Sequence, residues 1–167
     1  MFIKTYSRGG LEQFDKLDLL TPDTDVIISI RDTNSNQAKF PDDISILDLE
    51  FDDVSHLQVD KKTLTLCETA ISNKEVEKVK KLASKNQYPT LPMCYYHADL
   101  LEKFIYENVG FSRNIHINCT YGRSRSVAIA KFLSDFIFPT HKLEISREDS
   151  RVNPWVYKLL MKKFGYI

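Results

Sequence analysis

One stretch of twelve residues, 115–126, constrains the fold of this chain more than any other. It opens with the β-branched residues Ile115 and Ile117, reaches Cys119, and passes Gly122 before residues 127–133, whose composition favours a helix. This order predicts a strand, a tight loop and the N-terminus of a helix. Such a terminus has backbone N–H groups without intrahelical partners and the positive end of the helix dipole, so it attracts an anion.

Two side chains of this stretch bring chemistry to that anion site. Cys119 opens the loop, and a helix N-terminus favours the thiolate form of a cysteine. Arg125 completes the spacing Cys-x5-Arg and offers a planar guanidinium that fits two phosphate oxygens. We therefore expect a nucleophilic thiolate facing a phosphate group.

The segment Cys-Thr-Tyr-Gly-Arg-Ser-Arg-Ser resembles the signature loop of the protein tyrosine and dual-specificity phosphatase superfamily, especially its small bacterial and phage members. The resemblance implies a phosphocysteine intermediate on Cys119, a hydrogen bond from Ser126 to its sulfur, and no metal or cofactor. The phosphate-binding residues that it implies are Thr120, Tyr121, Gly122, Arg123, Ser124 and Arg125.

The residue before the cysteine departs from the family pattern, because Asn118 replaces the usual histidine. We expect Asn118 to support the loop by hydrogen bonding, but it cannot carry a charge, so we expect slower turnover. His116 would point to the same side of the strand. A partly buried strand histidine is the more common role for such a residue than a replacement for the missing one.

The family also uses an aspartate as general acid, and Asp52 and Asp53 are the best candidates. They follow a predicted strand at residues 44–51, and a parallel neighbour of the cysteine strand would end at the same edge of the sheet. Phe51-Asp52-Asp53 is similar to a pattern in the small bacterial and phage phosphatases. We favour Asp53, with Asp52 second, and an aspartate turn without chemistry stays open as the alternative.

The C-terminal segment carries a weaker resemblance. Asn153, followed by Val156, is similar to the closing helix of the same small phosphatases, in which the asparagine can brace the phosphate loop. An ordinary helix start explains the pattern equally well.

The remaining pattern predicts one α/β domain over residues 1–167, with a mostly parallel central sheet flanked by helices. Further strands are expected at 2–6 and 26–30, and a short helix after Ser7 with Leu11, Phe14 and Leu17 on one side. Longer helices are expected at 73–84, 93–108, from the cysteine loop to 136, and at 153–164. Residues 54–71 and the link after Pro139 carry no clear pattern.

Composition narrows the partners and the location. The chain has 23 basic and 23 acidic residues, so its zero net charge argues against bulk binding to nucleic acid or an anionic membrane surface. No secretory signal or membrane-spanning stretch is recognisable. Three widely spaced cysteines (Cys67, Cys94 and Cys119) show no metal-ligand spacing and indicate a reducing cytoplasm.

The leading hypothesis is a phosphatase acting on phosphorylated proteins, at phosphotyrosine alone or also at phosphoserine and phosphothreonine. One alternative is a catalytically weak phosphate-binding module, suggested by Asn118 and the open choice of acid. A second is a phosphatase of RNA 5′ ends or inositol lipids, which the zero net charge disfavours. A third, a rhodanese-type sulfurtransferase, has a shorter cysteine loop. The sequence gives no signal for an oligomeric state.

Overall fold

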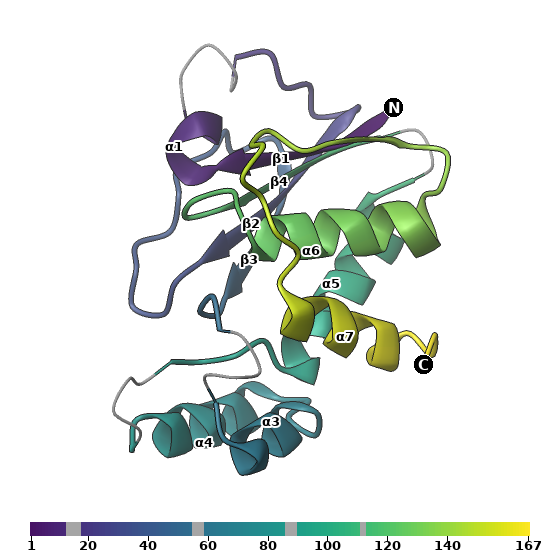
Figure 1. The fold of residues 1–167 in the computed structure, drawn as a ribbon. Helices are drawn as coiled ribbons and strands as arrows, with labels where there is room; N and C mark the ends of the chain where they lie inside the picture. Colours follow the sequence, from purple (N-terminus) through teal and green to yellow (C-terminus); the bar gives the residue numbers. More distant parts are fainter. Residues whose placement is uncertain (13–17, 55–58, 86–89, 111–112) are drawn as a thin grey trace.

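Five parallel strands form the centre of the computed structural model, which describes residues 1–12, 18–54, 59–85, 90–110 and 113–167 (Figure 1). The order across the sheet is β3-β2-β4-β1-β5. The strands are β1 (Phe2–Ser7), β2 (Asp25–Arg31), β3 (Ser45–Glu50), β4 (Asn114–Cys119) and β5 (Lys142–Glu144). The predicted α/β fold with a parallel sheet and flanking helices is confirmed.

Helices cover both faces of this sheet unequally. Figure 1 shows α5, α6 and α7 over one face and the single turn of α1 on the other, with α3 and α4 packed together below the sheet. The helices are α1 (Arg8–Leu11), α3 (Lys61–Cys67), α4 (Asn73–Ala83), α5 (Tyr95–Asn108), α6 (Arg125–Phe132), the π-helical turn η1 (Leu133–Ile137) and α7 (Pro154–Lys163).

The two central strands are buried on both faces, which explains their composition. All residues of β2 except Arg31 are buried, and β4 is buried from Ile115 to Cys119. Strands covered on both sides need apolar residues at successive positions, and β-branched side chains suit the extended backbone. Their polar carboxyl ends then meet at one edge of the sheet.

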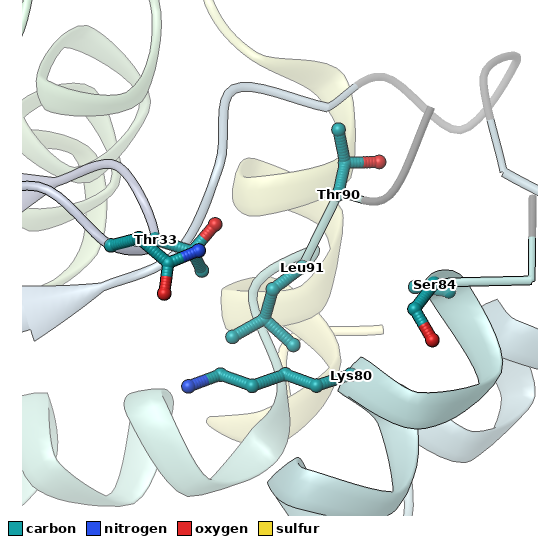
Figure 2. A pocket seen from close by; sticks show the side chains of 7 residues that line it. Thr33, Lys80, Ser84, Thr90 and Leu91 are labelled. Carbon is teal, nitrogen blue, oxygen red and sulfur yellow. The ribbon is translucent and has the colours of Figure 1, made fainter. Parts of the chain in front are cut away.

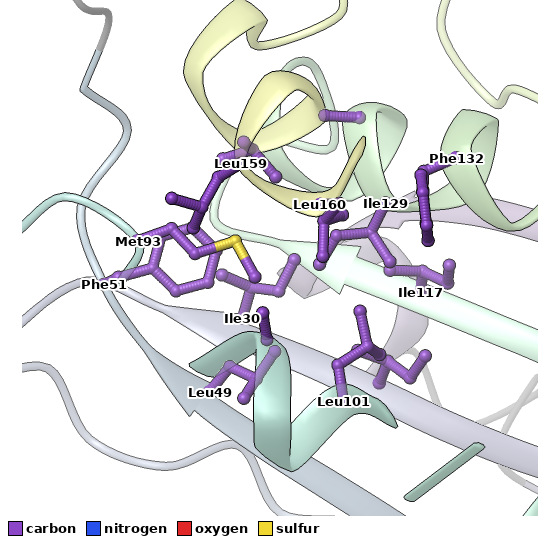
Figure 3. Close-up of a cluster of buried hydrophobic side chains, with 14 of the residues drawn as sticks. Ile30, Leu49, Phe51, Met93, Leu101, Ile117, Ile129, Phe132, Leu159 and Leu160 are labelled. Carbon is purple, nitrogen blue, oxygen red and sulfur yellow. The ribbon is translucent and has the colours of Figure 1, made fainter. Parts of the chain in front are cut away.

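The main core lies between the sheet and the helices α5, α6 and α7. Ile117 from β4, Ile129 from α6, and Leu159 and Leu160 from α7 meet there (Figure 3). A smaller cluster under α1 contains Tyr6, Leu11, Ile27 and Ile44. Because successive residues of a strand face opposite sides, Cys119 faces the main core, while Asn118 faces the smaller cluster.

The predicted elements are confirmed apart from their ends and two short additions. Cys94 has an extended backbone and caps α5, so this helix begins two residues later than the expected 93. The helix after the cysteine loop changes from α6 to the π-helical η1 before 136. Helix α3 and strand β5 lie in segments that carried no clear pattern. Ser7 caps α1 as expected; Phe14 and Leu17 lie outside the described residues.

Candidate functional site

The cysteine loop, residues 119–125, connects β4 to α6 as the sequence predicts. It turns at Gly122, whose φ of 68° lies in the left-handed region. A Cβ there would lie 2.5 Å from the backbone nitrogen of Ser7, so the end of β1 packs directly against the turn. Glycine therefore serves both the conformation and the close approach.

The backbone of this loop leaves N–H groups available at the start of α6. Within the described residues, the N–H groups of Tyr121, Arg123, Ser124 and Arg125 donate to no protein acceptor. Gly122, which was expected to bind phosphate through its N–H, instead donates to the carbonyl of Cys119 at 3.2 Å. The remaining groups sit where a helix dipole favours an anion.

Cys119 and Ser126 lie together below the loop. The Cys119 Sγ is 3.3 Å from the Ser126 Oγ, and both residues are buried. Ser126 belongs to the first turn of α6, so the helix holds the hydroxyl beside the sulfur. This is the contact that the resemblance implied.

Arg125 is almost fully buried, with 1% of its side chain exposed. Its Nη1 donates to the carbonyl of Phe51 at 2.5 Å, and its Nη2 donates to Thr120 Oγ1 at 3.2 Å and pairs with Asp32 at 2.8 Å. Its buried Nε has no partner among the described residues. A buried donor without an acceptor is unfavourable, so this atom is suited to an oxyanion.

Asp52 is fully engaged in holding backbone segments together. Its carboxylate accepts hydrogen bonds from the Thr33 N–H at 3.0 Å, the Thr33 hydroxyl at 2.9 and 2.8 Å, and the Leu91 N–H at 2.6 Å. The residue therefore ties the loop after β2 to the segment before α5. It contacts no residue of the cysteine loop in the described structure.

Asp53 points the other way and contacts the cysteine loop. Its Oδ1 accepts from the Ser124 hydroxyl at 2.8 Å and from Asn153 Nδ2 at 2.8 Å. Its Oδ2 has no partner among the described residues, and the residue is exposed. Asp53 is thus the aspartate of the two with an oxygen available to a ligand.

Strand β3 is not the neighbour of β4, so that part of the reasoning about the acid was wrong. Strand β2 lies between them and pairs with both. The edge of the sheet is still shared, because Arg125 reaches the Phe51 carbonyl. Strand β2 is one of the two neighbours of β4, and Asp32 directly follows its last residue, Arg31. No role was assigned to Asp32 from the sequence. Its position directly after a buried strand was the signal that could have identified it.

Asn118 and His116 take no part in the cysteine loop. Asn118 is fully buried, and neither of its amide atoms has a partner among the described residues, so the expected hydrogen bond to the loop is absent there. His116 lies between the Tyr6 hydroxyl at 3.1 Å and Asp25 Oδ1 at 2.8 Å. Burial lowers the pKa of His116, which is a buried strand histidine as expected.

Asn153 caps α7 and touches the acid candidate rather than the loop itself. Its Oδ1 accepts from the N–H groups of Trp155 and Val156, and its Nδ2 donates to Asp53 and to the Val54 carbonyl. The cysteine loop is instead braced by Arg151, two residues before Asn153. The Arg151 N–H donates to the Arg123 carbonyl at 2.8 Å.

Two loop side chains face outward. Arg123 pairs with Asp149 at 3.0 Å, so a neighbouring carboxylate balances its charge. Tyr121 is 67% exposed, which places an aromatic ring at the surface of the loop. Both arginines of the loop, Arg123 and Arg125, are therefore paired with a carboxylate.

Two hollows border this edge of the sheet. One, of about 180 Å³, is lined by Thr33, Asn34, Lys80, Ala83, Ser84, Thr90 and Leu91, and Lys80 extends past Leu91 along it (Figure 2). The other, of about 590 Å³, is lined by Arg8, Glu12, Asp18, Asn36, Gln37, Lys39, Phe40 and Pro41. Thr33 holds Asp52, and the Arg8 N–H donates to the Thr120 carbonyl, so both hollows adjoin residues that contact the site.

Comparisons with known proteins assign no relative to this chain: no family model, curated protein or solved structure matches it. None of the described helices is long and apolar enough to cross a membrane. Among the described residues, no group of histidine, cysteine and acidic side chains could hold a metal ion.

Proposed function

We propose that this protein is a cysteine-dependent phosphomonoesterase that acts on phosphorylated proteins. The observation that carries the proposal is the buried Arg125, whose Nε lacks an acceptor in the same loop as Cys119. A guanidinium donor, free backbone N–H groups and a helix N-terminus together match the oxygens of a phosphate group.

The reaction runs in two steps. The Cys119 thiolate attacks phosphorus, the bond from phosphorus to the ester oxygen breaks, and Asp53 Oδ2 gives its proton to that oxygen. Water then attacks the phosphocysteine and gives a proton back to Asp53, while the sulfur leaves as a thiolate that accepts a hydrogen bond from Ser126. Arg125 and the loop N–H groups stabilise the charge on the phosphoryl oxygens in both steps.

The contacts of the two aspartates support Asp53 as the acid. Asp53 has one oxygen fixed by Ser124 and Asn153 and the other open, which orients the proton it donates. Asp52 has both oxygens occupied by Thr33 and Leu91. A group held in this way supports the site without reaching the substrate.

A protein substrate fits the surroundings better than a polyanion. The charge of Arg123 is balanced by Asp149, and the whole chain carries no net charge. Binding to RNA or to inositol lipid depends on an excess of cationic side chains. The exposed ring of Tyr121 offers a contact for a phosphotyrosine side chain.

Hydrolysis of p-nitrophenyl phosphate and of a phosphotyrosine peptide, under reducing conditions from pH 5 to 8, tests the proposal. We expect turnover by the wild type and none by Cys119→Ser. Asp53→Asn should slow hydrolysis of the peptide more than hydrolysis of p-nitrophenyl phosphate. The tyrosine oxygen, with a pKa of about 10, needs protonation more than the p-nitrophenyl oxygen does when it leaves.

Asp52→Asn is the matched control, since it makes the same change one residue away. It should leave the ratio between the two substrates unchanged even if stability falls. Activity in Cys119→Ser would refute the proposal. An inactive wild type that binds vanadate through the loop would instead identify a phosphate-binding module.

A further inference from the structure

Asp32 is the acidic residue in closest contact with the buried guanidinium of the cysteine loop. It follows Arg31, the last residue of β2, which is the strand next to β4. Its Oδ1 pairs with Arg125 Nη2 at 2.8 Å, and its Oδ2 accepts from the Thr120 hydroxyl at 2.6 Å. Because Arg125 Nη2 also donates to Thr120 Oγ1 at 3.2 Å, the three side chains form a closed triangle.

This triangle fixes a group that could not otherwise stay buried. A guanidinium with 1% exposure needs a partner of opposite charge, and Asp32 is its only carboxylate partner in the described structure. The Phe51 carbonyl holds Nη1 on the other side. The plane of the guanidinium is thus set by Asp32 and Phe51, the residues that follow β2 and β3, and its buried Nε keeps no partner among the described residues.

The same contacts argue against Asp32 as a proton donor. Each of its oxygens already accepts a hydrogen bond from a side chain of the cysteine loop, whereas Asp53 keeps one oxygen open. Its charge is also unhelpful for simple anion binding, because a carboxylate beside Arg125 repels a phosphate. The benefit of Asp32 must then come from orienting Arg125 rather than from attracting the substrate.

We propose that Asp32 is a positioning residue that holds Arg125 in the orientation required by the phosphoryl-transfer transition state, an inference that rests on the proposed function. A residue of this kind raises kcat without improving the binding of phosphate in its ground state. Replacing Asp32 should therefore weaken the binding of a transition-state analogue more than the binding of phosphate.

The test compares Asp32→Asn with the wild type in kcat, in KM and in the inhibition constants of phosphate and vanadate. Vanadate, which accepts a fifth ligand from the thiolate, resembles the transition state, whereas phosphate resembles the ground state. We expect kcat to fall about tenfold and vanadate to bind about tenfold more weakly relative to phosphate. The inhibition constant of phosphate should stay the same or fall, since a like charge is lost.

Asp43→Asn is the matched control, because Asp43 is exposed in the same connection between β2 and β3 and contacts none of these groups. It should behave as the wild type does. If Asp32→Asn fails to fold, judged by circular dichroism, Thr120→Val removes the hydroxyl from the triangle and should shift the vanadate-to-phosphate ratio in the same direction.

The outcomes separate this inference from the proposed function. Wild-type turnover tests the function alone, and the two inhibition or binding constants can be measured even if turnover is absent. If the ratio of the vanadate and phosphate inhibition constants is the same in Asp32→Asn as in the wild type, the positioning role is overturned. A wild type that binds neither anion would overturn both.

Discussion

Three glycines of this chain, Gly9, Gly122 and Gly165, lie in different surroundings, and comparing them isolates what Gly122 does. Gly122 has a φ of 68° and a neighbouring backbone 2.5 Å from any added Cβ. Gly165 has a φ of 78° with open space around it, and Gly9 has open space and no positive φ. The three positions therefore differ in strain and in contact, while the chemical change to alanine is the same.

Alanine at these positions should give graded effects on the free energy of unfolding in urea. Gly165→Ala should cost about 1–2 kcal/mol for left-handed backbone alone. Gly9→Ala, in the first turn of a helix, should be neutral or stabilising by roughly 0.5–1 kcal/mol. Gly122→Ala should cost more than Gly165→Ala and should also abolish vanadate binding, because the loop must move away from Ser7. Equal costs at 122 and 165 would contradict the role of close approach.

His97 should make stability fall in mild acid. Burial lowers its pKa from 6.5 to about 4, and its Nδ1 accepts from the Cys94 N–H at 2.9 Å. Between these two pH values the unfolded chain binds a proton that the folded chain excludes. The contribution of His97 is therefore complete above pH 6.5, declines as pH falls, and is lost below about 4, in total about 3 kcal/mol.

The variant His97→Gln tests this dependence. Glutamine can still accept from the Cys94 N–H, as it does in capping boxes, but it does not titrate. Urea unfolding at several pH values between 4 and 7 should show a shallower loss of stability in the variant. The same pH slope in both proteins would show that another group controls acid sensitivity.

At the scale of elements, Asn153 links the start of α7 to Asp53. Asn153→Ala should lose the cap, about 1 kcal/mol, together with the hydrogen bond to Asp53. Asn153→Ser keeps a capping oxygen but loses the Nδ2 group that donates to Asp53. Its stability should therefore stay close to that of the wild type, while kcat on the phosphotyrosine peptide falls about fivefold.

The cap of α4 provides the control for Asn153. Ser72 accepts from the Glu75 N–H at 3.4 Å and has no contact with Asp53. Ser72→Ala should therefore lower the free energy of unfolding by about 1 kcal/mol with kcat unchanged. If Asn153→Ser retains full activity, the contact with Asp53 has no catalytic effect.

These elements also show what sequence reasoning could and could not find. The cap at Ser72 and the buried run of β2 were predictable, because they depend on neighbours in the chain. The order β3-β2-β4 depends on how side chains far apart in sequence pack, so the wrong neighbour was assigned to β4. Local pattern likewise left β5 unassigned, since its three residues gain their place only by pairing with β1.

The candidate site likewise has one part that the sequence predicted and another that only contacts between distant segments define. Cys119, Gly122 and Arg125 lie within one short segment, and the structure places them together in the strand, loop and helix that were expected. Asp52 and Asp53 are adjacent and alike in sequence, and only contacts with Thr33 and Asn153, from distant segments, separate their roles.

At the scale of the whole molecule, an oxyanion bound at the cysteine loop should stabilise the fold. The loop joins the ends of β4 and α6, and Arg125 contacts the segments after β2 and β3, so a ligand there bridges several elements. Under the proposed function, phosphate binds the folded chain and not the unfolded one. At a concentration 100 times Kd, it should raise the free energy of unfolding by about 2.7 kcal/mol.

For a domain of this size that gain corresponds to a rise in Tm of roughly 5–10 °C. Thermal unfolding in phosphate, compared with chloride at equal ionic strength, measures it. Arg125→Lys keeps the charge but loses the guanidinium fork, so most of the rise should disappear. An equal rise in chloride, or a full rise in Arg125→Lys, would mean that the stabilisation is a general salt effect and that the buried guanidinium does not bind the anion.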